Sequence, residues 1–347
     1  MVKLKPLFLS LSMVTSLAVA GCSNFSKESA GTTKSNGKET AAVKMAIDTA
    51  AGGSFQFRAA EKQGYFEKNS IKAQLSNFAY GIDTVNAVLT EQADTGLAAD
   101  YALLNSLGKG DMVVISTLTR GNEKSSKDNE LLVREGIKTE NDLKGKKLGV
   151  PKGTVTEYVW AKYLAAKHIN EKDITFVPYS TPDEAIVGMK NGDIDAVWSS
   201  GALKDKFKNI KGVTKLGDLE SAGVTIDSYL LAKRSFVEKN PKAVENTLKA
   251  LSEGIKYVDN NKKETAKLAF EQLKLPEKDA LKDIERQNYV LGFTEEDAKH
   301  LEDMKVWLEE KGKLKDKYEL KDKINLEALK KAFPESVTYK WNRSEVW

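Results

Sequence analysis

The sequence predicts an α/β protein with two lobes, and three observations support this prediction. Short apolar runs alternate with helical stretches from Val43 onward, which is typical of strands that pair in a sheet covered by helices. The same order of strands and helices occurs a second time further along the chain. A chain of 347 residues also exceeds what one core of ordinary domain size holds.

The first strand–helix unit begins near residue 43. Its expected strands are 43–47, 72–78 and 95–98, and its expected helices are 55–63 and 83–91. Gly64 is expected to end the first helix. Asp83 is expected to cap the second helix with its carboxylate. This alternation of strands with helices favours a parallel sheet.

The second unit repeats this order about a hundred residues later. Its expected strands are 147–150, 174–177 and 194–197, and its expected helices are 156–168 and 183–190. The stretch that starts at Asp83 aligns without gaps with the stretch that starts at Asp183. Identical residues are few, so the repeat is one of architecture more than of sequence. We expect two lobes of similar topology.

Composition excludes several classes of function. The net charge is +4, from 54 basic and 50 acidic residues that are interspersed, so no nucleic-acid partner is expected. One cysteine and two histidines are too few for an internal disulfide or a Cys/His zinc site. We expect no metal or cofactor. His168 and His300 are expected on the surface, because each lies in a Lys/Glu-rich helical stretch.

The N-terminus has the layout of an export signal. Lys3 and Lys5 precede an apolar run over 7–19 that is too short to span a membrane. The run ends at Val-Ala-Gly-Cys22, which resembles the lipobox of bacterial lipoproteins. An ordinary signal with a chance cysteine is the alternative. We expect 1–22 to be a lipoprotein signal peptide, Cys22 to carry the lipid, and 23–42 to be a flexible tether.

Four stretches carry a resemblance to a known family. They are Gln-Gly-Tyr-Phe-Glu at 63–67, Asp-Leu-Lys-Gly-Lys-Lys-Leu-Gly-Val at 142–150 with Lys-Gly-Thr at 152–154, Asp-Glu-Ala at 183–185 leading to Asn-Gly-Asp-Ile-Asp-Ala at 191–196, and Tyr-Leu-Leu-Ala at 229–232 with Phe236 and Pro241. The chain resembles the solute-binding lipoproteins of ABC transporters with the type II periplasmic-binding fold. It is most similar to their aliphatic sulfonate, taurine and nitrate branch.

This resemblance implies two Rossmann-like lobes with mixed sheets, joined by a two-strand hinge, with the ligand cleft between them. Lobe one would comprise 43–119 plus 234–347, and lobe two 129–233. The hinges would lie near 119–129 and 225–233. It further implies a monomer on the outer face of the cell membrane that binds a small-molecule anion and docks on a permease with its ATPase. A catalytic role is not expected.

The cleft should lie beyond the carboxyl ends of the strands. There Gly153 to Thr156 open a helix, whose free N–H groups make an anion site, although simple helix capping by Thr154 or Thr156 is the alternative. The expected ligand-binding residues on the cleft loops are Gly52, Gly53, Ser54, Tyr80, Gly81, Ala99, Asp100, Gly153, Thr154, Val155, Thr156, Trp198, Ser199 and Asp227.

Several alternatives stay open at this point. Arg120 is either a solvated surface residue or a partner for an anionic head group. Trp160 is expected in the core more than in the ligand wall. The expected substrate is a small alkyl sulfonate such as taurine, with nitrate, bicarbonate or a pyrimidine precursor of thiamine as alternatives. An enzyme on the same fold is disfavoured, because the cleft loops hold no histidine and the chain has no Gly-x-Ser-x-Gly or P-loop motif.

Overall fold

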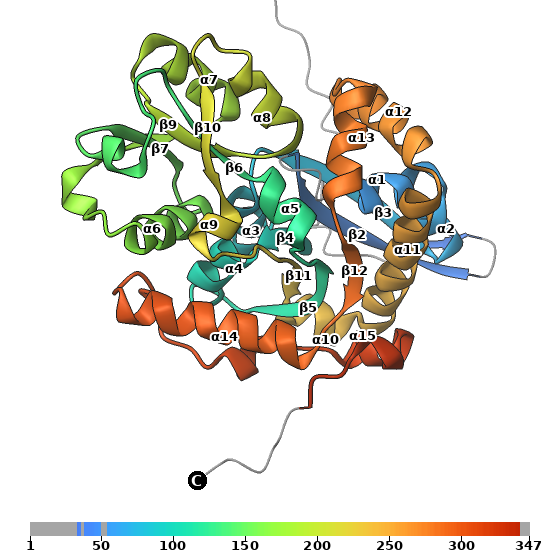
Figure 1. Ribbon diagram of the computed structural model, residues 1–347. Helices are drawn as coiled ribbons and strands as arrows, with labels where there is room; N and C mark the ends of the chain where they lie inside the picture. The colour runs from blue at the N-terminus through green and yellow to red at the C-terminus, as the bar shows by residue number, and fades with distance from the viewer. Residues whose placement is uncertain (1–32, 36–37, 50–53, 341–347) are drawn as a thin grey trace, which may run out of the picture.

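The computed structural model describes residues 33–35, 38–49 and 54–340. The expected signal peptide with Cys22, the loop residues Gly52 and Gly53, and the last seven residues lie outside the described residues. The described chain forms two lobes, each built on its own sheet (Figure 1). No helix in the described ranges is long and apolar enough to span a membrane.

The first lobe holds a seven-stranded sheet in the order β1-β2-β4-β11-β5-β12, and β3 also pairs with β2, along residues 41–48. Its strands are β1 (Thr33–Ser35), β2 (Lys38–Asp48), β3 (Ile71–Phe78), β4 (Thr95–Ala99), β5 (Met112–Thr119), β11 (Ser228–Lys233) and β12 (Tyr289–Gly292). β2 begins inside the expected tether, because Ala41 and Ala42 pair in parallel register with the start of β3. β1 also lies inside the expected tether and pairs with the start of β2. The expectation that 23–42 is all flexible tether is therefore wrong for residues 33–35 and 38–42.

The second lobe holds a five-stranded sheet in the order β10-β6-β9-β7-β8. Its strands are β6 (Glu130–Val133), β7 (Lys147–Pro151), β8 (Thr175–Tyr179), β9 (Ala196–Ser199) and β10 (Thr214–Asp218). The two sheets share a topology. β2 is parallel to β3 and β4, just as β7 is parallel to β8 and β9. The repeated architecture and the expected mixed sheets are confirmed.

Each sheet receives one antiparallel strand directly after the chain crosses from the other lobe. β6 enters the second sheet beside β9, and β11 enters the first sheet between β4 and β5. The expected assignment of residues up to 233 to lobe two is therefore wrong for β11, whose backbone pairs entirely within lobe one. The first crossing contains the helix α5 (Glu123–Asp128) in place of a hinge strand.

Helices cover both sheets and form most of the C-terminal part of the chain (Figure 1). In lobe one these are α1 (Phe55–Lys62), α2 (Tyr65–Lys68), α3 (Gly81–Leu89), α4 (Asp100–Leu107), α10 (Arg234–Lys239), α11 (Pro241–Asn260), α12 (Lys262–Leu273), α13 (Glu277–Arg286), α14 (Glu295–Glu310) and α15 (Glu327–Ala332). In lobe two they are α6 (Thr156–Ala166), α7 (Pro182–Asn191), α8 (Gly201–Lys208) and α9 (Leu219–Ala222). Short 3-10 turns occur at Glu140–Leu143, Glu171–Asp173, Leu320–Lys323 and Pro334–Ser336.

Local sequence explains how these helices begin and end. Gly64 follows α1 with φ near +69°, a conformation that glycine adopts at little cost. α3 begins two residues before the expected cap. Tyr80 is its N-cap, and Asp83 lies in the first turn, where its carboxylate accepts a hydrogen bond from the Tyr80 N–H at 3.2 Å. The prediction of Asp83 as the N-cap is therefore wrong.

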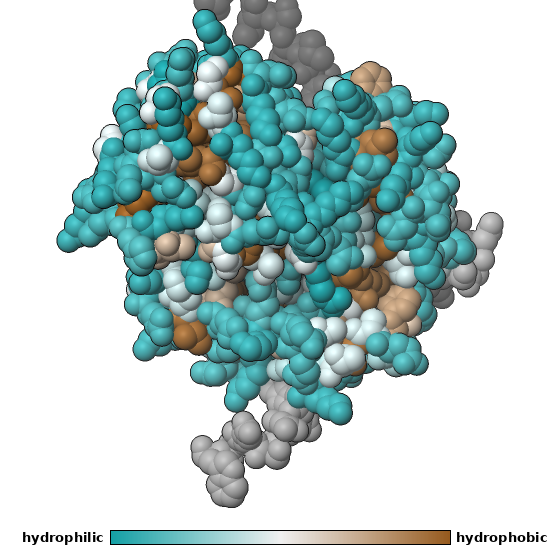
Figure 2. Space-filling view, in the orientation of Figure 1, coloured by the Kyte–Doolittle hydropathy of each residue, from teal (hydrophilic) through white to brown (hydrophobic). Residues whose placement is uncertain are grey.

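The apolar residues form separate cores in the two lobes. The largest cluster packs both faces of the first sheet, and a second one joins α1 to α11, α12 and α13. In lobe two, one cluster around Trp160 and another around Phe207 cover the sheet. The outer surface in Figure 2 is mostly hydrophilic, with small apolar patches. Each lobe thus has hydrophobic cores of its own.

Candidate functional site

A cavity of about 230 Å³ lies between the lobes, beyond the carboxyl ends of β2, β4, β7 and β9. Its volume far exceeds the space that one water molecule needs. The wall from lobe one includes Asp48, Tyr80, Gly81, Ile82, Leu97, Ala99 and Ala102. The wall from lobe two includes Pro151, Thr154, Val155, Thr156, Val159, Tyr179, Trp198, Ser199, Ser200, Leu203 and Leu219. The crossings and the end of α13 supply Thr119, Arg120, Gly121, Ser125, Asn129, Ile226, Ser228, Arg286 and Gln287.

The structure brings most of the expected site residues together at this cavity. Those that line it are Tyr80, Gly81, Ala99, Thr154, Val155, Thr156, Trp198 and Ser199. Four others do not line it: Ser54, Asp100, Gly153 and Asp227. Gly52 and Gly53 lie outside the described residues. The hydroxyl of Ser54 donates to the carbonyl of Asp48, which does line the cavity.

The start of α6 differs from the expected anion site. The N–H of Gly153 donates to the Oε1 atom of Glu157 at 2.7 Å, so this donor is already satisfied within the helix. The hydroxyl of Thr154 donates to the carbonyl of Pro151, also at 2.7 Å. Thr154 therefore fixes the turn while it lines the cavity. The prediction of a free Gly153 N–H is wrong, because a carboxylate one helical turn ahead competes for it.

Asp100 and Asp227 link the two crossings to lobe one through hydrogen bonds. Asp100 is fully buried and accepts hydrogen bonds from the Asp227 N–H at 3.1 Å and from Nε2 of His300 at 2.8 Å. Asp227 in turn accepts from the N–H of Gly121 in the first crossing at 2.8 Å. These carboxylates join the two crossings to each other and to α14.

His300 is therefore not the surface residue that its sequence context indicated. Burial lowers its pKa, but the hydrogen bond to Asp100 and the charges of Asp100, Asp227 and Asp297 outweigh burial and raise the pKa to about 9. His168 is exposed, as expected.

Arg120 has a different role from either one expected. Its Nε and Nη2 atoms donate to the two carboxylate oxygens of Asp297 at 2.7 and 2.6 Å, in a bidentate pair. Asp297 is almost completely buried. Arg120 thus ties the first crossing to α14 while part of its side chain lines the cavity.

Trp198 lies on strand β9 and not on a cleft loop, which corrects the prediction. Only 6% of Trp198 is exposed, and its ring packs edge-on against Trp160 and Tyr163, with centroid distances of 5.8 and 5.3 Å. Trp198 nevertheless lines the cavity. Trp160 is fully buried and donates from Nε1 to the carbonyl of Gly149, so its expected core position is confirmed.

The lining residues that the sequence-based prediction missed include the polar side chains of Asp48, Asn129, Tyr179 and Arg286. Asp48 and Tyr179 end strands β2 and β8, so the rule that sites lie at strand ends was sufficient to find them. Asn129 lies at the end of the first crossing. Arg286 ends a C-terminal helix far along the chain, and no local pattern marks it.

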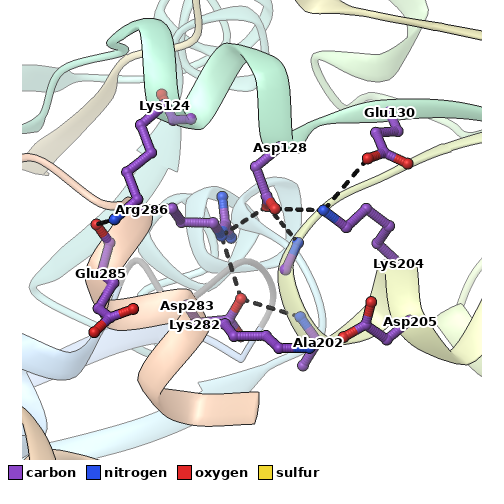
Figure 3. Close-up of polar contacts among 12 residues, drawn as sticks. Lys124, Asp128, Glu130, Ala202, Lys204, Asp205, Lys282, Asp283, Glu285 and Arg286 are labelled. Carbon is purple, nitrogen blue, oxygen red and sulfur yellow. Dashed lines mark hydrogen bonds and ion pairs between the residues drawn. The ribbon is translucent and has the colours of Figure 1, made fainter. Parts of the chain in front are cut away.

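A cluster of charged residues joins the lobes beside the cavity (Figure 3). We call Asp128, Lys204, Asp283 and Arg286 the interlobe polar cluster. The Nε atom of Arg286 lies 3.2 Å from Asp283 and 3.4 Å from Asp128. Asp128 also pairs with Lys204 on α8. Charges from α5, α8 and α13 thus meet at one point.

The same cluster covers the N-terminus of α8. Asp283 accepts a hydrogen bond from the N–H of Ala202 at 3.2 Å, and Asp128 accepts one from the N–H of Gly201 at 2.7 Å. Carboxylates at a helix N-terminus are favoured by its unpaired N–H groups and its dipole. This contact therefore fixes lobe two against α13 of lobe one.

On the opposite side of the cavity, α6 contacts lobe one directly. The hydroxyl of Tyr101 donates to Glu157 at 2.7 Å, and the rings of Tyr158 and Trp307 meet edge-on with centroids 4.7 Å apart. The cavity is thus closed by contacts between the lobes on both flanks. Within the described residues, no group of acidic, histidine or cysteine side chains is arranged to hold a metal ion.

Comparison with known proteins agrees with this geometry. The family model described as NMT1/THI5 like matches residues 54–265. A Brucella abortus protein described as a binding protein is 25% identical over 221 residues, which is 62% of this chain and 66% of that protein. The match thus spans just under two thirds of that relative's length.

Solved structures share the fold. The aliphatic sulphonate binding protein SsuA of Escherichia coli superposes with a TM-score of 0.70 at 21% identity, over 82% of this chain and 97% of its own. The alkanesulfonate-binding protein SsuA of Xanthomonas axonopodis pv. citri, bound to MOPS, gives a TM-score of 0.71 at 16% identity, over 82% and 98%. The two-lobed periplasmic-binding fold is therefore confirmed.

Proposed function

The chain belongs to the NMT1/THI5-like family, and from this we propose that it is the solute-binding component of an ABC importer. It captures a small organic solute between its lobes and presents the closed complex to a permease and its ATPase. The observation that carries the proposal is the cavity of about 230 Å³ enclosed by both lobes at the carboxyl ends of their strands. A binding role without catalysis accords with this geometry.

The substrate that we propose first is a small aliphatic sulfonate. Hydroxyl groups of Thr156 and Ser199 belong to residues of the lobe-two wall, and such donors suit sulfonate oxygens. Two solved relatives with this fold are named for sulfonate binding. Nitrate and bicarbonate are less suitable, because much of the remaining wall is apolar or aromatic.

A second candidate is a flat heterocycle such as a pyrimidine. Tyr80, Tyr179 and Trp198 bring three aromatic rings to the cavity. Aromatic side chains stack on flat rings. Burial raises the pKa of Tyr80 and of Tyr179 far above the usual tyrosine value, so both hydroxyls stay neutral at physiological pH.

We also propose that the protein is a lipoprotein held by Cys22 on the outer face of the cell membrane. The sequence around Cys22 supports this. A lipid anchor would keep the binding lobes near the permease. We propose that the protein acts there as a monomer.

A thermal-shift screen tests the function. The full chain would be melted with taurine, alkanesulfonates, nitrate, bicarbonate, thiamine precursors and riboflavin. A ligand that binds only the folded state raises the midpoint by mass action. A shift with sulfonates supports the first candidate, and a shift with ring compounds alone supports the second. No shift with any compound would count against the proposed function for these classes.

A further inference from the structure

Four cavity-lining residues carry buried polar atoms that have no hydrogen-bond partner among the described residues. The atoms are Oδ1 of Asp48, Oδ1 of Asn129, Nε1 of Trp198 and Oγ of Ser199. Buried polar atoms are nearly always paired, because an unpaired one costs free energy. Four such atoms around one cavity indicate that a solute supplies their partners.

The lobe-two end of the cavity requires an acceptor from this solute. The Nε1–H group of Trp198 can only donate, and the hydroxyl of Ser199 can donate or accept. Both residues are at least nine-tenths buried, at the carboxyl end of β9. Asn129 precedes Glu130, which pairs with Ser199 across the sheet. Its amide can turn to present either its oxygen or its NH₂ group, so it suits the same acceptor.

The lobe-one end requires a donor. Asp48 ends strand β2, and its carboxylate can only accept once it is ionised. The positive charge of Arg58 acts on Asp48, but no hydrogen bond joins Arg58 to the buried Oδ1 atom of Asp48. The three guanidinium nitrogens of Arg58 donate to Ser54, Gln272 and Asn77. Burial raises the pKa of Asp48 to about 7, with Arg58 opposing the rise, which is typical of a carboxyl group without a bonded cation.

We infer that the solute carries an amine that pairs with Asp48 and, at its other end, an oxygen acceptor such as a sulfonate that meets Trp198 and Ser199. The inference rests on the proposed function and narrows its substrate to amine-bearing sulfonates. An alkanesulfonate without an amine has only hydrogen-bond acceptors, so it leaves the Asp48 carboxylate without a donor. Because the two recognition ends belong to different lobes, only a solute with both groups satisfies them together.

Matched pairs of compounds test this inference by titration calorimetry on the full chain. Taurine differs from ethanesulfonate by one amino group, and homotaurine differs from propanesulfonate in the same way. We expect each amine to bind at least about tenfold more tightly than its amine-free partner, as one charge-assisted hydrogen bond provides. Asp48→Asn should abolish this preference, whereas Asp111→Asn, on an exposed surface pair, should keep it.

A second variant tests the acceptor end. Trp198→Phe replaces the indole by a smaller aromatic ring and removes the N–H donor, so it should weaken the binding of both compounds of each pair alike. The melting midpoint of each variant confirms that it folds. Equal binding within the pairs, or an unchanged preference in Asp48→Asn, overturns the inference and leaves the proposed function standing. If none of the four compounds binds, the inference also fails, and the wider thermal-shift panel then decides the proposed function separately.

Discussion

The carboxylate of Asp283 on α13 accepts a hydrogen bond from the N–H of Ala202 on α8, at 3.2 Å, and so joins the two lobes. The contact depends on Gly201, the first residue of α8. Its φ is +57°, and a Cβ atom built there would lie 1.6 Å from Oδ1 of Asp283. A methyl group at this position would therefore displace the carboxylate of Asp283 from the start of α8.

Gly201→Ala should therefore open the lobes. We expect a larger radius of gyration in small-angle scattering and weaker solute binding, because Asp283 can no longer reach the start of α8. Gly312→Ala is the matched control, since its φ is +63° and a Cβ atom there meets nothing within 4 Å. Both variants carry similar backbone strain. An equal radius of gyration in the two variants would disprove the role of this contact.

Stability should depend on pH through His300. Its folded pKa of about 9 exceeds the ordinary value of 6.5, because of Asp100 with Asp227 and Asp297 nearby. Protonation therefore favours the folded state, fully below pH 6.5, and this stabilisation is lost as pH rises through 9. We expect the free energy of unfolding to fall by roughly 2–3 kcal/mol across this window.

Urea unfolding at several pH values measures this effect. His300→Gln should flatten the profile between pH 6.5 and 9. His168→Gln, at an exposed histidine, should keep the wild-type profile. A profile that stays steep in His300→Gln would assign the effect to another group.

Trp160 is expected to contribute to stability and not to solute affinity. Trp160→Phe leaves the carbonyl of Gly149 without its donor in a buried site. We expect a loss of about 1–3 kcal/mol in the free energy of unfolding. Titration with the best panel compound should give an affinity within about twofold of wild type. A large loss of affinity with unchanged stability would instead make Trp160 part of the ligand wall.

Cys22 gives a test of the membrane anchor. Cells fed a radiolabelled fatty acid should label the wild-type protein and not Cys22→Ser. The variant should also leave the membrane fraction, because one lipid group is its expected anchor. Labelling of Cys22→Ser would contradict the lipoprotein hypothesis.

Strand and helix order was predictable from the sequence, because periodic apolar residues specify local structure. Sheet membership was not. β11 reads as an ordinary apolar strand, yet it crosses to lobe one and pairs with β4 and β5. Which sheet a strand joins depends on contacts far along the chain, and periodicity carries no such information.

The site was predictable to the extent that it lies at strand ends. Tyr80, Thr154 and Ser199 line the cavity for this reason. His300 and Arg286 escaped the prediction, because their partners lie on elements distant in sequence. The sequence also did not show that a side chain of the protein would compete with a ligand for a backbone donor. The Gly153 N–H donates to Glu157 in this way.

Titration calorimetry on a variant with a filled cavity tests the central claim, that the solute binds between the lobes. Thr156 lines the cavity, whereas Thr175 is exposed on β8. With the panel compound that gives the largest thermal shift, we predict one binding site in wild type and in Thr175→Trp. In Thr156→Trp the affinity should fall by about a hundredfold or more, because the added ring occupies the solute's space. Wild-type affinity in Thr156→Trp, with its fold intact, would contradict the account.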